Sequence, residues 1–386
     1  MDTLTPTLAE QTAKEPVASP AASDRMHLDY LDGLRALAAL TVMFGHAALQ
    51  IWPIFTTDRR PVGTAKWVLA VFSHGHYAVS VFIVISGFCL MLPVIRNGGV
   101  LKGGAALFFK KRARRILPPY YLAMGCSLLL IWLLIGQKTG THWDSSLPVT
   151  WKGVVAHLLL VQDIYGAPQI NHVFWSIAVE WQIYFVFPLL VLLWKRYDGL
   201  KTTAGMLILS AIMVYGLGKT PLQSTTYLTL QYFGLFAVGM LAAEIAYSKE
   251  AVWAERRARI PWAVFLAAAI LIAAFLDRHQ RGWIADYFVG FATLSLLILA
   301  ARSANNPIKN ILSWRPFVFL GLYAYSIYLI HAPLLQVVWQ YMLHPLHLGD
   351  LTTFALLALV GCPLILGGAY LFYLACERPF LTRARS

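Results

Sequence analysis

Apolar stretches of about 20 residues recur along the whole chain and alternate with short polar segments; a helix needs about that length to cross a bilayer. On this basis we predict ten membrane-crossing segments, at 33–52, 76–95, 117–136, 172–194, 202–218, 227–247, 260–276, 283–301, 317–342 and 351–375. A shorter apolar stretch, 153–162, predicts a re-entrant or interfacial helix. The pattern therefore predicts an all-α polytopic membrane protein with about ten transmembrane helices.

The composition agrees with a membrane protein. Hydrophobic residues make up 59% of the 386 residues and charged residues 13%, whereas soluble domains carry about 25% charged residues. We expect one transmembrane domain, 28–380, and no separate soluble domain. Residues 1–27 have no apolar stretch, which predicts a disordered tail rather than a cleavable signal peptide, and 381–386 form a second, short tail.

The Lys and Arg residues are divided unevenly between alternate loops. Twenty-two fall in the tails and in the loops on one side of the predicted bundle, eight fall on the other side, and Arg35 lies inside the first segment. Positively charged loops stay in the cytoplasm, so both tails are predicted there, as in a multi-pass protein of the bacterial inner membrane. We read the net charge of +13 as a topology signal and a source of contacts with the lipid bilayer, and expect no nucleic acid as a partner.

Several common kinds of site have no signature in the sequence. The four cysteines, Cys89, Cys126, Cys362 and Cys376, form no C-x-x-C pair and lie in apolar stretches, which favours buried structural thiols and predicts no metal site. The sequence also contains no Gly-rich nucleotide loop, G-x-S-x-G elbow or H-E-x-x-H helix. This argues against a soluble-type hydrolase or ATPase joined to the membrane domain.

Two ionisable residues lie within the first predicted segment. Arg35 and His46 are eleven residues apart, which is three helical turns plus roughly 20°, so they share one face and lie about 16 Å apart along the axis. Ionisable groups inside a membrane helix are costly and mark functional sites by default. The alternative is structural: His46 hydrogen-bonds a neighbouring helix, and Arg35 extends to the lipid headgroups.

Five basic residues crowd into 110–115, directly before the third predicted segment. Arg112 and Arg115 are three residues apart, so both point the same way on a helix. Guanidinium groups match phosphate oxygens in bidentate geometry. We therefore predict a phosphate clamp at the cytoplasmic end; the alternative is an anchor that holds the loop to anionic lipid.

Ser176, Glu180 and Tyr184 form a stripe along the fourth predicted segment, at spacings of four. A carboxylate there needs a partner, and we expect His46 or an arginine of the clamp to supply one; a structural bond between helices is the alternative. His331, in the ninth segment, stands two residues before a proline. It either lines a cavity or is a satisfied core histidine beside a proline kink.

From Tyr30 to Pro379 the chain resembles the integral-membrane O-acylases called acyltransferase family three. The resemblance rests on stretches that follow the order of the family: Leu31-Asp-Gly-Leu-Arg35 through His46, Phe82-Ile-Val-Ile-Ser-Gly-Phe88, Arg112-Ala-Arg-Arg115 with Ile116-Leu-Pro118, Trp175-Ser-Ile-Ala-Val-Glu180, Tyr325-Ser-Ile-Tyr-Leu-Ile-His331 and Glu377-Arg-Pro379. The chain departs from the family at Ser80, where other members often carry an acidic residue.

The resemblance implies a core of ten helices, an acyl-CoA donor (usually acetyl-CoA) that enters from the cytoplasm, and a carbohydrate or related hydroxyl as acceptor. It also implies functional roles for Arg35, His46, Arg112 and Arg115. No permanently bound cofactor is expected. Some members carry a C-terminal esterase-like domain; because this chain ends at Ser386, we expect it to acylate its acceptor directly or with a separate partner.

These residues together lead to a hypothesis for the reaction. The arginines hold the CoA phosphates and His46 is the general base, with Glu180 orienting its imidazole or stabilising the cation; in a second route His46 is itself acylated first. The expected acceptor is a surface or exported polysaccharide or oligosaccharide. Two other classes stay open: a proton-coupled transporter that uses the same intramembrane groups, and a scaffold in glycan-assembly machinery.

Overall fold

The computed structural model describes residues 28–55, 61–166, 169–220, 228–302 and 306–381. Its α-helices are α1 (Asp29–Ile51), α2 (Thr64–Phe72), α3 (Gly75–Arg96), α4 (Gly104–Leu130), α5 (Trp151–Leu158), α6 (Gln162–Tyr165), α7 (Trp175–Tyr197), α8 (Gly199–Leu217), α9 (Gln231–Tyr247), α10 (Ala251–Arg259), α11 (Trp262–Arg278), α12 (Gly282–Ala301), α13 (Pro307–Leu312), α14 (Arg315–Leu322), α15 (Ala324–Val338), α16 (Asp350–Leu356) and α17 (Cys362–Phe372). Short 3-10 or π segments continue or connect them: η1 (Ile131–Ile135), η2 (His142–Ser146), η4 (Trp339–Leu343), η5 (His344–Leu346), η6 (Leu357–Gly361), η7 (Tyr373–Glu377) and η8 (Arg378–Phe380). The described residues form no strand, which confirms the predicted all-α class.

The ten predicted segments all overlap helical structure. Seven lie on continuous runs long and apolar enough to cross a bilayer: Asp29–Ile51, Thr64–Arg96, Gly104–Ile135, Trp175–Tyr197, Gly199–Leu217, Gly282–Ala301 and Asp350–Phe380. Two more lie on bent pairs, α10 with α11 at 67° and α14 with the run Ala324–Leu346 at 74°. The remaining segment falls on α9, a shorter apolar helix of 17 residues. This architecture confirms a multi-pass membrane protein.

The structure moves the predicted boundary between loop and helix at the basic stretch 110–115. Residues 110–115 are helical and not part of a loop, because α4 begins at Gly104 and continues through Pro118 and Pro119. The clamp arginines therefore stand on the same helix as the membrane-crossing residues that follow them. The predicted tail 1–27, and residues 382–386 of the second tail, lie outside the described residues.

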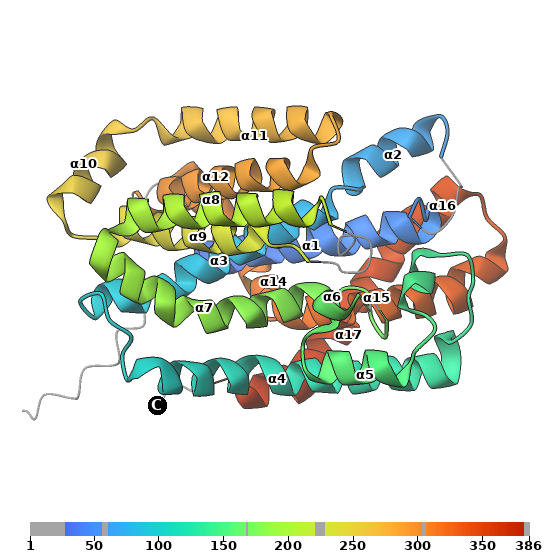
Figure 1. The fold of residues 1–386 in the computed structure, drawn as a ribbon. Helices are drawn as coiled ribbons and strands as arrows, with labels where there is room; N and C mark the ends of the chain where they lie inside the picture. The colour runs from blue at the N-terminus through green and yellow to red at the C-terminus, as the bar shows by residue number, and fades with distance from the viewer. Residues whose placement is uncertain (1–27, 56–60, 167–168, 221–227, 303–305, 382–386) are drawn as a thin grey trace, which may run out of the picture.

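Most of the long helices run roughly side by side (Figure 1), and α9 contacts α3, α8 and α12. Two glycines allow α3 and α9 to meet closely: a β-carbon on Gly87 would lie 2.1 Å from the carbonyl oxygen of Phe236, and one on Gly239 would lie 2.0 Å from that of Val84. Small residues at crossings let membrane helices approach and gain packing energy. Helix α1 contacts α3, α14 and α15, so most of its residues are buried among other helices.

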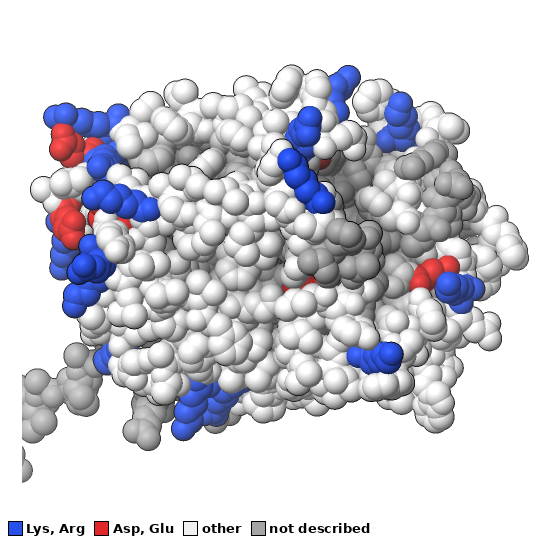
Figure 2. All heavy atoms as spheres, viewed as in Figure 1, with Lys and Arg blue, Asp and Glu red and all other residues white. Residues whose placement is uncertain are grey.

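The outer surface of the bundle is apolar over wide areas. On α11, for example, Phe265, Leu271 and Phe275 are 56%, 70% and 61% exposed. Figure 2 shows one face of the molecule as largely uncharged, with Lys and Arg gathered mainly at the end where α10 lies. An apolar surface of this extent suits hydrocarbon rather than water.

Candidate active site

A cavity of about 380 Å³ opens where α1, α3, α4, α7, α14 and α15 meet. Three basic and three acidic side chains line it, together with Ser176: Arg35, Arg112, Arg115, Asp32, Glu180 and Glu377. Six residues that the sequence pointed to, Tyr184 included, are thus brought together from α1, α4 and α7. Volumes of about 300–1,000 Å³ are usual for small-molecule sites, so this space suits part of a large donor molecule.

Arg35 is held inside the bundle. Its Nη1 donates a hydrogen bond to Asp32 Oδ1 at 2.6 Å, and its Nη2 donates to Cys89 Sγ at 3.0 Å. The alternative in which Arg35 extends to lipid headgroups does not describe this conformation. Asp32, which sequence reasoning did not single out, partly neutralises the guanidinium and fixes its direction.

Arg112 and Arg115 line the same cavity, as expected from their spacing on α4. Arg112 is half-buried and Arg115 is exposed, so the pair extends from the interior to the opening. The Nε of Arg112 is buried and has no hydrogen-bond partner among the described residues. A buried N–H without a partner costs free energy, and an incoming anion is one group that can satisfy it.

Glu180 has partners other than the expected His46. Ser86 Oγ donates to Glu180 Oε1 at 2.8 Å, and the Tyr184 hydroxyl donates a short hydrogen bond to the same oxygen. The expected hydrogen bond from Glu180 to His46 is not found among the described residues. The carboxylate shares the cavity of the clamp arginines, but no hydrogen bond or ion pair joins it to either of them among the described residues.

Ser176 contacts Tyr328, and both residues line this cavity. The two hydroxyls are 2.6 Å apart, and the Tyr328 hydroxyl also donates to the Val173 carbonyl at 3.0 Å. The ring centroid of Tyr328 lies 5.9 Å from that of His331. Tyr328 thus lines the charged cavity and also lies against His331.

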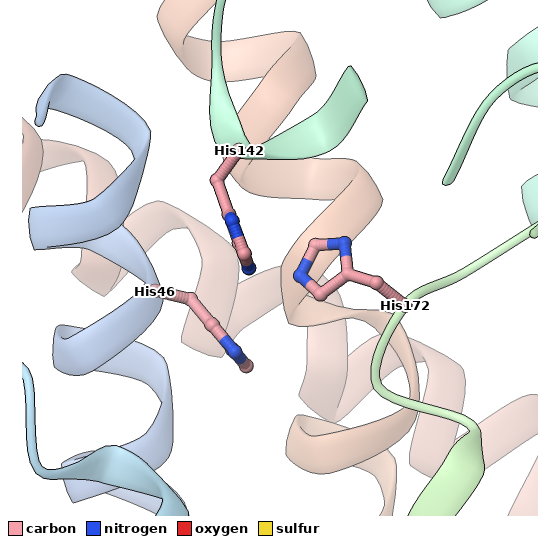
Figure 3. Close-up of side chains that lie close together, drawn as sticks. All are labelled: His46, His142 and His172. Carbon is pink, nitrogen blue, oxygen red and sulfur yellow. The ribbon is translucent and has the colours of Figure 1, made fainter. Parts of the chain in front are cut away.

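Four histidines cluster beyond Tyr328, and they come from four separate segments: His46 on α1, His142 in η2, His172 just before α7 and His331 on α15. His46 Nδ1 is 2.8 Å from His331 Nε2. The ring centroid of His46 lies 5.6 Å from that of His142 and 5.0 Å from that of His172. Figure 3 shows the side chains of His46, His142 and His172 pointing toward one another.

Hydrogen bonds determine which nitrogen of His46 is free. His331 Nδ1 lies 3.0 and 2.9 Å from the carbonyl oxygens of Ile327 and Tyr328. Carbonyl oxygens only accept, so this bonding pattern assigns the hydrogen to His331 Nδ1 and makes its Nε2 an acceptor for His46 Nδ1–H. Neutral His46 then presents an unprotonated Nε2, the form that a general base requires.

Sequence reasoning missed His142 and His172. Burial lowers the pKa of His142 to about 4, which leaves it neutral near pH 7. His142 Nδ1 and His172 Nε2 are buried and have no hydrogen-bond partner among the described residues. The sequence gives one indication for His172, which stands three residues before the Trp175–Glu180 stretch. It gives none for His142, which belongs to no recognised sequence motif.

A second cavity, of about 360 Å³, lies on the other side of the histidines and is rich in polar groups. Gln50 and Thr141 line it, together with Trp339, Asp350 and Thr353. Gln50 is one helical turn beyond His46, and Thr141 directly precedes His142.

Both α1 and α15 cross from one cavity to the other. Along α1, Arg35 lines the first cavity and Gln50 lines the second; at 1.5 Å per residue they lie about 16 Å before and about 6 Å beyond His46. Along α15, Tyr328 lines the first cavity, His331 follows, and the continuation η4 lines the second. The histidines thus stand between two openings.

A carboxylate does occur beside Ser80, although the chain lacks an acid at that position. Ser80 Oγ donates to Asp286 Oδ1 at 2.6 Å, and Gln231 Nε2 donates to Asp286 Oδ2 at 3.0 Å. All three side chains are buried. Helix α12 therefore places a carboxylate next to the position where the family often has one of its own.

Comparison with known proteins agrees with this architecture. A family model described as an acyltransferase domain matches residues 28–374. The chain belongs to acyltransferase family three. No solved structure matches the chain significantly.

Two similar proteins match about four fifths of the chain, and a third matches less than half of it at higher identity. The putative peptidoglycan O-acetyltransferase YrhL of Bacillus subtilis (strain 168) is 27% identical over 337 residues, which are 79% of this chain and 48% of YrhL. Nodulation protein 10 of Rhizobium leguminosarum bv. viciae is 26% identical over 351 residues, 81% of this chain and 85% of that protein. Acyltransferase MdmB of Streptomyces mycarofaciens is 34% identical over 170 residues, 42% of this chain and 39% of MdmB. The chain thus spans about half the length of YrhL.

Proposed function

We propose that this protein is an O-acyltransferase of the bacterial inner membrane that moves an acetyl group from acetyl-CoA to a hydroxyl of a cell-surface or exported carbohydrate. One observation carries the proposal: along α1 an arginine-lined cavity, a histidine with a free Nε2, and a second polar cavity follow one another. The names of relatives such as YrhL support an acetyl group and a glycan acceptor.

In this proposal the first cavity binds the donor. Arg115 at the opening and Arg112 further inside meet the CoA phosphates, because guanidinium forks match phosphate oxygens. Arg35, oriented by Asp32, lies deepest along α1 and meets the donor next. The thin arm of CoA then extends about 16 Å toward His46, past Tyr328, which lines this cavity.

The acceptor occupies the second cavity. Sugar hydroxyls both donate and accept hydrogen bonds, and the Gln50 amide and the Thr141 and Thr353 hydroxyls offer matching partners. Trp339 adds an aromatic surface against which the apolar face of a sugar ring can pack. Because this cavity is one helical turn from His46, an acceptor hydroxyl bound there reaches Nε2.

His46 acts as general base in this scheme. Its Nε2 takes the hydroxyl proton while the acceptor oxygen attacks the thioester carbonyl; the new O–acyl bond forms, the C–S bond breaks, and the CoA sulfur takes the proton back from the imidazolium. His331 orients the imidazole and accepts a hydrogen bond from its cation. His331 thus takes the orienting role that the sequence assigned to Glu180.

The test is acetyl transfer from radiolabelled acetyl-CoA in membranes that contain the protein, followed by fractionation of the glycans. Wild type is compared with His46→Ala and with His279→Ala, a change of an exposed histidine at the end of α11. We expect label in one glycan fraction, unchanged in His279→Ala and reduced about 100- to 10,000-fold in His46→Ala.

Equal labelling by wild type and His46→Ala at equal protein level would remove His46 from the reaction. Acceptor flux across the membrane without consumption of acetyl-CoA would instead support the proton-coupled transporter, since that class also uses charged groups inside the membrane.

A further inference from the structure

Three of the four clustered histidines, His46, His142 and His172, each offer one nitrogen as a possible metal ligand. The proposed acyl transfer uses His46 but gives no role to His142 or His172. We propose that His46, His142 and His172 bind one divalent transition-metal ion, of which Zn²⁺ is the best fit, and that the bound ion blocks acyl transfer. The blocking part rests on the proposed role of His46 as a base. The sequence predicted no metal site because that prediction depended on cysteines and on local spacing.

The distances allow such a site. The three imidazoles offer one nitrogen each, and these nitrogens all lie within 4.8 Å of one another. Tetrahedral coordination at zinc–nitrogen distances of about 2.0–2.1 Å separates ligand nitrogens by about 3.4 Å. To bring nitrogens that lie 4.8 Å apart to this separation, each ring must move by about 1 Å. Rotation of the side chains supplies a movement of that size. The ligands come from α1, η2 and the turn before α7 (Figure 3).

Neighbouring groups prepare the nitrogens for a metal. His331 accepts the hydrogen of His46 Nδ1 and leaves Nε2 of His46 with a lone pair. His172 Nδ1 lies 3.0 Å from Ser146 Oγ, which leaves Nε2 of His172 for the cluster. Outer hydrogen bonds of this kind orient the histidine ligands of metal sites.

Unpartnered atoms give a second, independent indication. His142 Nδ1 and His172 Nε2 are both buried without a hydrogen-bond partner among the described residues. Buried polar atoms are nearly always satisfied by protein, water or an ion. The two rings are neighbours, with centroids 4.5 Å apart, so one cation bound between the rings can satisfy nitrogen atoms of both.

The donor set favours one class of ion. Imidazole nitrogen suits Zn²⁺, Cu²⁺ and Ni²⁺, whereas Mg²⁺ and Ca²⁺ prefer oxygen. Three protein ligands leave a fourth position open for water or another small ligand. The three rings are half-buried rather than sealed, and Thr141 of the second cavity adjoins His142, which gives an ion a route inward.

A bound ion and the proposed reaction compete for the same atom. The base mechanism needs the lone pair of His46 Nε2, and a metal at the cluster occupies that lone pair. The metal-bound enzyme therefore cannot take the acceptor proton through His46, and Zn²⁺ is expected to inhibit.

The experiment uses the full chain in detergent, purified through a tag without histidine and stripped of metal. Co²⁺ is added as the probe, because tetrahedral Co²⁺ has visible absorption that hexaaqua Co²⁺ largely lacks. Wild type is compared with His142→Gln and His172→Gln. The control variant carries both His344→Gln and His347→Gln, which removes two exposed histidines near the second cavity.

We expect one tetrahedral Co²⁺ per chain in wild type and in the control variant, displacement by Zn²⁺, and loss of the band in both cluster variants. Wild type without the band, or cluster variants that keep it, would overturn the site. These readings need no enzymatic activity, so a failure of the proposed acetyl transfer leaves them unaffected.

The blocking part is tested by acetyl transfer with added Zn²⁺. We expect inhibition of wild type and at least a tenfold weaker inhibition of His142→Gln, because His142 takes no part in the proposed chemistry. Equal inhibition of the two proteins would overturn the blocking role, and a cluster variant that fails to fold is replaced in this comparison by the other one.

Discussion

The hydrogen bond between His46 and His331 gives a prediction with a defined magnitude. In His331→Leu the side chain keeps an apolar volume in a fully buried position, but His46 Nδ1 loses its acceptor at 2.8 Å. Two effects follow. His46 is no longer held in the tautomer with a free Nε2, and the imidazolium that forms during the reaction loses a hydrogen bond.

The magnitude comes from the change in strength of that hydrogen bond. A neutral hydrogen bond contributes about 0.5–1.5 kcal/mol and one to a charged group about 1.5–3 kcal/mol. The difference, about 1–1.5 kcal/mol, is gained only as His46 takes the proton, and it corresponds to about 5- to 12-fold in rate. Without His331, His46 populates both neutral tautomers, and only one of them has an unprotonated Nε2, which lowers the rate by about another factor of two. We therefore expect kcat to fall about 10- to 25-fold in total.

The assay is steady-state acetyl transfer with purified protein, with KM for acetyl-CoA measured beside kcat. KM should change little, because His331 is not among the residues that line the donor cavity. His331→Gln should recover part of the rate, since its amide oxygen can accept the hydrogen of His46 Nδ1. An unchanged kcat in His331→Leu, with the protein folded, would refute the assignment of the His46 tautomer.

Three further predictions concern the donor cavity, the packing and the pH dependence. Arg112→Gln should weaken CoA binding about 10- to 100-fold, measured by calorimetry, because a charged hydrogen bond to phosphate is lost; Arg114→Gln, on the same helix but absent from the cavity lining, should bind normally. Gly87→Ala should lower the unfolding free energy by about 1–3 kcal/mol, since its β-carbon would lie 2.1 Å from a carbonyl oxygen of α9; Gly205→Ala, with nothing within 4 Å, should be neutral or slightly stabilising. Burial lowers the pKa of His157 in α5, so the unfolded chain binds more protons and stability should fall as pH drops below about 6.5; His157→Leu should reduce that fall in thermal midpoint.

Each of these has an outcome that contradicts it. Equal CoA affinity of the two arginine variants would mean that α4 only anchors the protein to lipid. A Gly87→Ala protein as stable as Gly205→Ala would mean that α3 and α9 do not pack as closely as described. If the thermal midpoint of His157→Leu falls with pH as much as that of wild type, groups other than His157 cause the pH dependence of stability.

The sequence was sufficient for features that depend on local properties of the chain. The apolar stretches predicted ten helices because a backbone in lipid must satisfy its hydrogen bonds within each segment. Helical periodicity placed Arg35 and His46 on one face, and Arg112 beside Arg115, since that spacing is fixed along any helix. Among the described residues the structure has seven helices able to cross a membrane, or nine if each bent pair is one span, and a shorter apolar helix at the remaining predicted segment. It places Arg35 and His46 on α1 and lines one cavity with Arg112 and Arg115.

The arrangement between segments could not be predicted in the same way. Glu180 bonds Ser86 and Tyr184 rather than His46, and Asp286 of α12 reaches Ser80 of α3. Which helices touch depends on where small residues such as Gly87 let two backbones approach. That is a property of two surfaces together, and neither segment shows it alone.

The histidine cluster illustrates this division most directly. The sequence marked His46 and His331 because each interrupts an apolar helix, where an ionisable side chain is costly. His142 lies in the 3-10 segment η2 and His172 lies just before α7, and neither interrupts a long apolar helix in the way that His46 and His331 do. Their place beside His46 is decided only when η2 and the turn before α7 fold over α1, because contacts between residues far apart in sequence arise from packing and not from local pattern.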